Sequence, residues 1–344
     1  MVTSNTILKQ NGSPTSGPQL IRDGADQSGF WTEPTRLGTL DASRVHRMHV
    51  NEEYRAESIP QPGEIIVRRI PFEFPDDIDP HWKHDEPEWS HMINGASLTM
   101  PYLEPFLIDS MRDALERIDD PAVREEARGF IAQEGQHYRQ HRRYNDHIKS
   151  SYPELAAIEE DMQRSFDRMR ARRSLRFRMG FTAGFETMTM GVTRWLVAER
   201  RDLFAEADTR VSSFVLWHMV EETEHKRVAF NVYQAACPGY WMRALGVLTG
   251  SLHVMWYSRR AYIAMLSHDG LWRDLRSRLR LWRRAAQFLR HTVPCLVRGM
   301  LPGHTPDKET DPIWVRDWIA NYARRGDAAG LPLIDTSSAD LPAP

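Results

Sequence analysis

The chain has 344 residues and a formal net charge of −2, so it carries no excess of positive charge that would point to nucleic acid as a partner. Its two cysteines, Cys237 and Cys295, are too few for a disulfide framework or a thiolate metal site, and they fit a reducing, cytoplasmic location. No run of apolar residues is long enough to predict a transmembrane helix, and the N-terminus lacks the apolar core of a secretory signal.

The N-terminal part of the chain is expected to contribute no helix to the core. Residues 1–60 are rich in Gly, Ser, Pro and charged residues, a composition that predicts a largely disordered segment. The stretch GEIIVRRIPFEF, residues 63–74, alternates apolar and charged residues in part, which predicts one or two short strands or an extended arm. The helical body is expected to begin near Pro87.

The first bundle helix is expected within residues 89–118, and its unusual feature is an isolated acid. Glu104 stands among apolar neighbours that include Leu103 and Phe106. A carboxylate in such surroundings is costly to bury without a partner. Pro105 follows directly, and a proline disfavours the helical conformation at the residue before it.

The second helix, expected over residues 121–150, carries Glu134 and His137. Residues three apart on a helix lie on nearly the same face, so this pair can aim a carboxylate and an imidazole at one point. A strongly charged helix over residues 154–173 follows and is expected to lie outside the core. The next helix again holds an isolated acid, because Glu186 is the only acidic residue between Arg178 and Arg194.

The fourth helix, expected over residues 211–233, carries a second Glu-x-x-His pair, Glu222 and His225, and Asp208 or Thr209 can cap its start. His218 lies four residues before Glu222 and about 20° from His225 on a helical wheel, so it is a further candidate nitrogen ligand.

The remaining chain is expected to form additional helices over residues 239–326 and a flexible tail over residues 327–344. Eight arginines and one acid, Asp274, lie between residues 271 and 300, interleaved with Trp272, Trp282 and Phe288. This pattern suits peripheral contact with a membrane surface. It equally suits a helix packed on the bundle with its arginine stems along the surface, and the sequence leaves both interpretations open.

Taken together, two isolated acids alternate along the chain with two Glu-x-x-His pairs. Glu104 precedes Glu134 by 30 residues and Glu186 precedes Glu222 by 36. At a rise of about 1.5 Å per residue, such spacings place all four acids at similar depth in antiparallel neighbouring helices. The pattern predicts an all-α, ferritin-like four-helix bundle with a di-metal core over residues 61–238, together with the N-terminal arm.

Oxygen and nitrogen donors without thiolates favour iron, with manganese or a mixed manganese–iron pair as alternatives. The predicted ligands of the two metal ions are Glu104, Glu134, His137, Glu186, His218, Glu222 and His225. His141 is expected to support these ligands or to be unrelated to them. Glu221 and Glu224 point away from Glu222 on a helical wheel and are expected to face solvent or to support the ligands.

The stretch from about residue 65 to residue 233 resembles the predicted metal-dependent hydrolase family, a ferritin-like helical group. The matching segments are IIVRRIPFEF, NGASLTMPYLEPF, FIAQEGQHYRQHRRYN, TAGFE and WHMVEETEHKRVAFNVY, and they contain every predicted ligand. The order of the ligands also resembles that of the arylamine N-oxygenases. Those di-iron enzymes use four glutamates and three histidines, and their additional histidine lies four residues before the last glutamate, as His218 does here.

The function favoured by this pattern is a non-haem di-iron oxygenase or oxidase that activates O2 to oxidise a small organic substrate, for example by amine N-oxygenation or hydroxylation. A separate electron donor is expected, since the chain has no flavin or iron–sulfur motif. The alternative is a hydrolase whose dinuclear centre activates water, as the family's name implies. The sequence leaves the substrate, the donor and the oligomeric state open.

Overall fold

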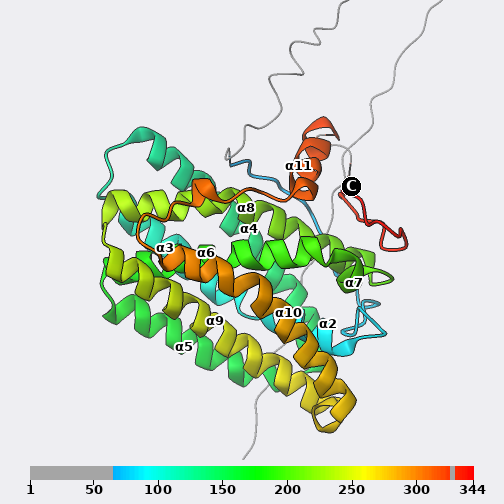
Figure 1. Cartoon of the computed structure of the whole chain (residues 1–344). Helices are drawn as coiled ribbons and strands as arrows, with labels where there is room; N and C mark the ends of the chain where they lie inside the picture. The colour runs from blue at the N-terminus through cyan, green and yellow to red at the C-terminus, as the bar shows by residue number, and fades with distance from the viewer. Residues whose placement is uncertain (1–64, 326–329) are drawn as a thin grey trace, which may run out of the picture. The chain divides into compact units, whose positions relative to one another are not determined.

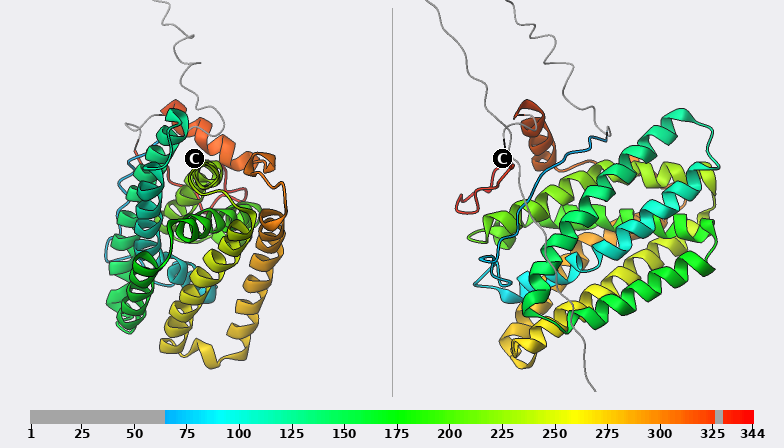
Figure 2. Two further views of the ribbon diagram at one scale, coloured as in Figure 1. Left: turned by 90° about the vertical axis from the view of Figure 1, so that its left-hand side faces the viewer. Right: turned by 180° about the vertical axis from the view of Figure 1, so that it is seen from behind.

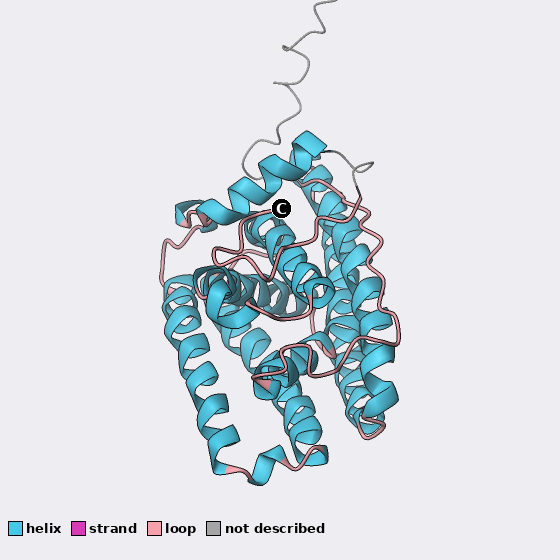
Figure 3. Ribbon diagram, turned by 90° about the vertical axis from the view of Figure 1, so that its right-hand side faces the viewer, coloured by secondary structure: helices cyan, strands magenta, loops and turns pink. Residues whose placement is uncertain are grey.

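The structure is a computed structural model that describes residues 65–325 and 330–344. The disorder expected for residues 1–60 lies outside these ranges. Within them the chain is all-helical and contains no β-strand, as Figure 3 shows, so the all-α prediction is confirmed. Residues 65–75 form the extended arm rather than strands. The helices belong to one compact unit, Asn51–Pro344.

Four long helices form the bundle: α3 (Met100–Leu115), α4 (Pro121–Ser151), α6 (Leu175–Ala198) and α8 (Thr209–Ala236). α3 packs against α4 and α6, and α8 packs against α4 and α6, so the four helices enclose a common core (Figure 1). Side chains cap three of their starts: Asp120, Ser174 and Asp208 each accept hydrogen bonds from backbone N–H groups of the first turn.

α3 corrects one expectation, because it is regular helix at Glu104 in spite of Pro105. The proline removes only its own N–H, which would have bonded to the carbonyl of Pro101 in the first turn. That loss costs about 3 kcal/mol in a helix interior. Leu103 and Phe106 are fully buried beside it, and burying such side chains stabilises by about 1.5–3 kcal/mol each, which offsets the cost.

α5 (Leu155–Arg172) corrects a second expectation. Its polar face is strongly charged, but Leu155, Met162 and Phe166 on the other face are buried in the main core, against α3 and α9. Most of the charge of the segment therefore lies on its outer face, with the buried Glu159 as an exception, and the apolar residues at helical spacing place it in the fold.

Two further long helices, α9 (Tyr240–His268) and α10 (Leu275–Met300), cover α6, and the short turn η1 (Leu271–Arg273) joins them. α9 approaches α6 closely because Gly180 and Gly184 of α6 face Gly246 of α9. A Cβ atom at Gly246 would overlap the carbonyl of Gly180, so the contact requires glycine. α2 (Pro87–Ser97) packs on α9 beside the bundle.

The short helix α7 (Arg200–Phe204) lies between α6 and α8 in the chain. After α10 follow η2 (Pro306–Lys308) and α11 (Ile313–Arg325), and the chain ends in an irregular segment. A flexible tail was predicted over residues 327–344. In its described part, residues 330–344, Ile334 and Leu341 are fully buried, and the indole N–H of Trp314 donates to the carbonyl of Leu341 at 2.9 Å. Among the described helices, none combines the length and apolar content needed to cross a membrane.

Candidate metal centre

The seven predicted ligands lie together in the middle of the bundle, and each of the four helices contributes at least one of them. α3 provides Glu104, α6 provides Glu186, α4 provides Glu134 and His137, and α8 provides His218, Glu222 and His225. None of these side chains is more than 4% exposed. The helical spacing of each pair, together with the antiparallel packing, is what brings residues more than 80 positions apart in the chain to one point.

Glu222 lies at the centre of the group, within reach of all three histidines. Its Oε1 atom is 2.8 Å from Nε2 of His218 and 3.7 Å from Nδ1 of His137. Its Oε2 atom is 3.6 Å from Nδ1 of His225. Glu134 occupies a similar place on α4, with Oε1 3.2 Å from Nδ1 of His225 and Oε2 3.8 Å from Nδ1 of His137.

The donor atoms form overlapping groups, each within 4.8 Å. One group lies toward α6 and consists of Glu134, Glu186, Glu222 and His225. Two others consist of Glu104 with Glu134 and His137, and of His137 with His218 and Glu222, and a further group joins Glu104 and His218 to His141. Glu134 and Glu222 belong both to the group that contains Glu186 and to a group without it, so two cations could share their carboxylates.

A metal pair fits these residues because their inward atoms form no hydrogen bond with the described residues, although carboxylates and imidazoles lie against one another. These atoms are both carboxylate oxygens of Glu104 and of Glu134, Oε1 of Glu186, Oε2 of Glu222, and Nδ1 of His137 and of His225. Buried charged groups without partners are strongly unfavourable. Two divalent cations would balance the four carboxylates, and an oxygen and nitrogen donor set without sulfur suits iron or manganese.

The electrostatics of the protein atoms indicate the same need for positive charge. Burial raises the pKa of Glu104 well above its usual value, and the charges of Glu134 and Glu222 raise it further. Burial likewise raises the pKa of Glu186, and the charge of Glu222 adds to the shift. Four carboxylates at this depth repel one another unless protons or cations lie between them.

Behind His137, a buried ion-pair network holds the ring in place. Nε2 of His137 lies 2.8 Å from Oε2 of Glu221, and Arg68 donates to Oε1 of Glu221 at 3.0 Å. Glu221 was expected to face solvent or to support the ligands, and it is fully buried. A carboxylate at this position directs the proton to Nε2 and leaves the lone pair of Nδ1 facing the centre.

The tautomer of His225 follows from a second set of contacts. Gln133 donates from Nε2 to Oε2 of Glu224 at 2.7 Å, which turns its amide oxygen toward Nε2 of His225 at 2.8 Å. An amide oxygen can only accept, so Nε2 of His225 carries the proton and Nδ1 is free to bind a cation. Arg68 pairs with Glu224 as well, at 2.7 Å, and thereby links the two networks.

His218 is oriented by a chain of polar groups that passes through His141. Ser97 donates its hydroxyl proton to Oδ1 of Asn145 at 2.6 Å, so it accepts from Nδ1 of His141 at 2.8 Å. Nε2 of His141 then accepts from Nδ1 of His218 at 2.7 Å. The lone pair of His218 Nε2 is thus directed at Oε1 of Glu222. Two acceptors at 2.8 Å need a cation or a proton between them.

Sequence reasoning missed Arg68 and Gln133. Arg68 comes from the extended arm, which crosses α4 and α8, and it is only 1% exposed. The one available signal was a pair of arginines, Arg68 and Arg69, between Val67 and Ile70 in a mostly apolar stretch. Gln133 directly precedes Glu134 and gives no signal of its own, because its role depends on how α4 faces α8.

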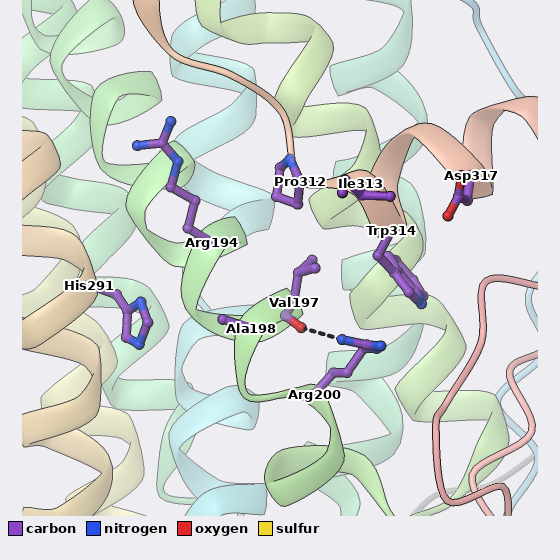
Figure 4. A pocket seen from close by; sticks show the side chains of 9 residues that line it. All are labelled: Arg194, Val197, Ala198, Arg200, His291, Pro312, Ile313, Trp314 and Asp317. Carbon is purple, nitrogen blue, oxygen red and sulfur yellow. Dashed lines mark hydrogen bonds between the residues drawn. The ribbon is translucent and has the colours of Figure 1, made fainter.

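A cavity of about 410 Å³ adjoins the centre and has Glu222 and His218 at its inner end. α2, α6, α9 and α10 provide its walls. The walls are mostly apolar, with Met188 and Phe288 among them, and the polar side chains that line the cavity include Ser97, Thr189 and Arg259. A second hollow, of about 500 Å³, is lined by residues that include Arg194, His291 and Trp314 (Figure 4). None of the seven predicted ligands lines it.

A family model, described as predicted metal-dependent hydrolase, matches residues 66–310. The matched region contains the arm, the four bundle helices with every predicted ligand, and also α9 and α10, which the sequence set apart from the bundle. No curated protein and no solved structure matches the chain. Since the family match covers most of the chain, the protein belongs to the predicted metal-dependent hydrolase family.

Proposed function

We propose that the protein is a non-haem di-iron oxygenase or oxidase that acts on a small organic substrate. The observation that carries the proposal is the set of seven buried residues with oxygen and nitrogen donors, six of which have a donor atom without a hydrogen bond, beside a mostly apolar cavity. The ligands would be Glu104, Glu134, His137, Glu186, His218, Glu222 and His225. Bound iron would supply the redox chemistry that reduces O2 and oxidises the substrate.

The residues of the chain then have distinct tasks. Glu134 and Glu222 would hold both ions, while Glu221, Gln133 and His141 keep the three histidines in the tautomers that offer a lone pair. The inner end of the cavity is formed by His218 and Glu222, so a substrate would reach the centre from this side. The apolar walls exclude water and favour substrates with little polar surface.

A hydrolase is the second candidate, and the family's name favours it. Two metal ions can activate water and polarise an ester or phosphate. Such a reaction needs water at the centre, and the mostly apolar cavity walls disfavour it. The cavity is thus the reason that oxidation is placed first.

The test is to load metal-free protein anaerobically with two equivalents of Fe(II), admit O2, and follow O2 uptake and the visible spectrum. The proposal expects O2 uptake in proportion to bound iron, its loss in Glu134→Ala, and its retention in Glu125→Ala, an exposed residue of the same helix. Two bound metal ions without O2 uptake, together with hydrolysis of esters or phosphoesters, would favour the hydrolase instead.

A further inference from the structure

From Tyr240 to Trp256 the outward face of α9 consists of apolar and aromatic side chains, and the exposed Arg259 follows on the same face. Every residue classed as exposed from Tyr240 to Trp256 is of this kind. Along this face lie Trp241, Leu245, Leu248, Leu252 and Trp256, which are 43–81% exposed. Their spacing of three or four residues makes one continuous stripe along the helix. Exposed apolar residues are common singly, but a stripe of this length marks an interaction surface.

α10 carries a second such stripe. It consists of Leu275, Leu279, Trp282, Leu289, Val293 and Val297, which are 43–72% exposed. The opposite side of the helix, which includes Leu281, Arg284 and Cys295, is buried against the bundle. The apolar face of an amphipathic surface helix normally faces the core. In α10 the exposed apolar stripe points away from the bundle, so packing within the described chain does not explain why these positions are apolar.

Positive charge accompanies this outward face. Within the described residues, Arg276, Arg278 and Arg290 are exposed and form no ion pair with an acid, and α10 itself contains no acidic residue. Other arginines of the helix do have acidic partners: Arg280 pairs with Glu88 at 2.7 Å and Arg284 with Glu86. The interpretation of a helix packed on the bundle therefore holds for Arg280 and Arg284, and it does not account for the three unpaired arginines. An apolar stripe flanked by unpaired arginines complements an anionic lipid surface.

The cavity beside the metal centre opens on the same face. Leu252 and Trp256 of α9 and Leu289 of α10 line it, and these three residues are also 45–61% exposed. α9 and α10 run side by side in opposite directions along this part of the molecule (Figure 2). An apolar molecule could therefore pass from the exposed stripes to Glu222 between apolar walls.

We propose that the outward face of α9 and α10 docks on an anionic lipid bilayer, and that the cavity takes a long-chain, acyl-bearing substrate from it. The substrate class rests on the proposed oxidation at the metal centre, whereas the docking surface does not. Since none of the described helices can span a membrane, the contact is interfacial, with the apolar stripes at the level of the lipid headgroups and the first acyl carbons.

The docking surface is tested by sedimentation of the full-length, metal-loaded protein with vesicles of phosphatidylglycerol and phosphatidylcholine, and of phosphatidylcholine alone. Leu279→Glu and Trp282→Glu change residues that do not line the cavity. Each is expected to weaken binding roughly tenfold or more, as loss of apolar burial and gain of a charge predict. Ile313→Glu, at a 68% exposed residue of α11, is the matched control and should bind as the unaltered chain does. Arg276→Gln with Arg290→Gln should reduce binding to the anionic vesicles only.

The substrate class is tested with a dansyl-labelled fatty acid in the absence of vesicles. Ala285 lines the cavity and its neighbour Ala286 is exposed outside it. Ala285→Trp should weaken binding of this probe, while Ala286→Trp should not. Equal binding by both variants would overturn the assignment of the cavity to acyl chains.

The docking proposal is overturned if the unaltered chain does not bind anionic vesicles, or if the Trp282→Glu variant binds them as well as the unaltered chain does. It is also overturned if light scattering shows a dimer that Trp282→Glu converts to a monomer, because the face would then bind a second copy of the chain. Vesicle and probe binding require no turnover, so they remain measurable if O2 uptake fails. Failure of the proposed function is therefore distinguishable from failure of this inference.

Discussion

At the scale of single residues, the histidines of the centre depend on groups that do not touch it. Gln133, Glu221 and His141 each fix one ring nitrogen of a ligand histidine and leave the other nitrogen to face the carboxylates. Support of this kind sets the tautomer and the basicity of a ligand, and its loss typically costs tenfold to hundredfold in metal affinity.

Replacement of Gln133 with leucine should therefore lower the affinity for Fe(II) by roughly 10- to 100-fold while the fold is retained. The measurement is a competition titration against a chelator, with circular dichroism to confirm the helix content. Gln140 provides the matched control: it also lies on α4 and donates to the arm, at the carbonyl of Ile70, but it contacts no predicted ligand. Equal losses in Gln133→Leu and Gln140→Leu would show that the arm, rather than His225, is responsible.

Arg68 is a second residue whose effect can be measured. Its substitution by methionine leaves Glu221 and Glu224 buried without their cation, which should destabilise the fold by about 3–5 kcal/mol. Urea denaturation of the metal-free protein gives this value. The exposed neighbour Arg69 changed to methionine should shift stability by no more than about 0.5 kcal/mol. A small effect of Arg68→Met would mean that the two glutamates are protonated or solvated.

At the scale of helices, the sequence predicted those helices whose apolar residues recur at helical spacing. α3, α4, α6 and α8 follow from the spacing of apolar residues and from caps such as Asp120 and Asp208. The core role of α5 was missed because its charged residues are as numerous as its apolar residues. Helix through Pro105 was missed because a local rule yielded to the burial of Leu103 and Phe106. Which side chains support the ligands depends on the facing of neighbouring helices, which sequence spacing alone does not determine.

The contact between α6 and α9 offers a direct test at this scale. Gly246→Ala places a methyl group against the carbonyl of Gly180, so the helices must separate, and we expect a loss of about 1–3 kcal/mol in unfolding free energy. Gly135→Ala is the opposite case, because the space beside Gly135 on α4 is open apart from the end of Arg139. There alanine should stabilise by about 0.5–1 kcal/mol. Thermal or urea unfolding of both variants, compared with the unaltered protein, measures the two changes in unfolding free energy.

At the scale of the whole described molecule, α9 and α10 connect the features that sequence reasoning treated separately. They cover α6, form walls of the cavity beside Glu222, and carry the exposed apolar stripes. The family match extends over both helices, so they belong to the fold that holds the centre. The candidate centre, the cavity and the outward apolar face therefore follow one another through the molecule.

The central claim is that the bundle holds two metal ions between Glu134 and Glu222, and counting bound metal tests it most directly. Metal-free protein is loaded anaerobically with Fe(II), desalted, and analysed for iron per chain by mass spectrometry. We predict two iron ions per chain for the unaltered protein and for the control Glu125→Ala, and one or fewer for Glu222→Ala, which removes a shared carboxylate. A single ion in the unaltered protein, or two ions retained in Glu222→Ala, would contradict the dinuclear centre.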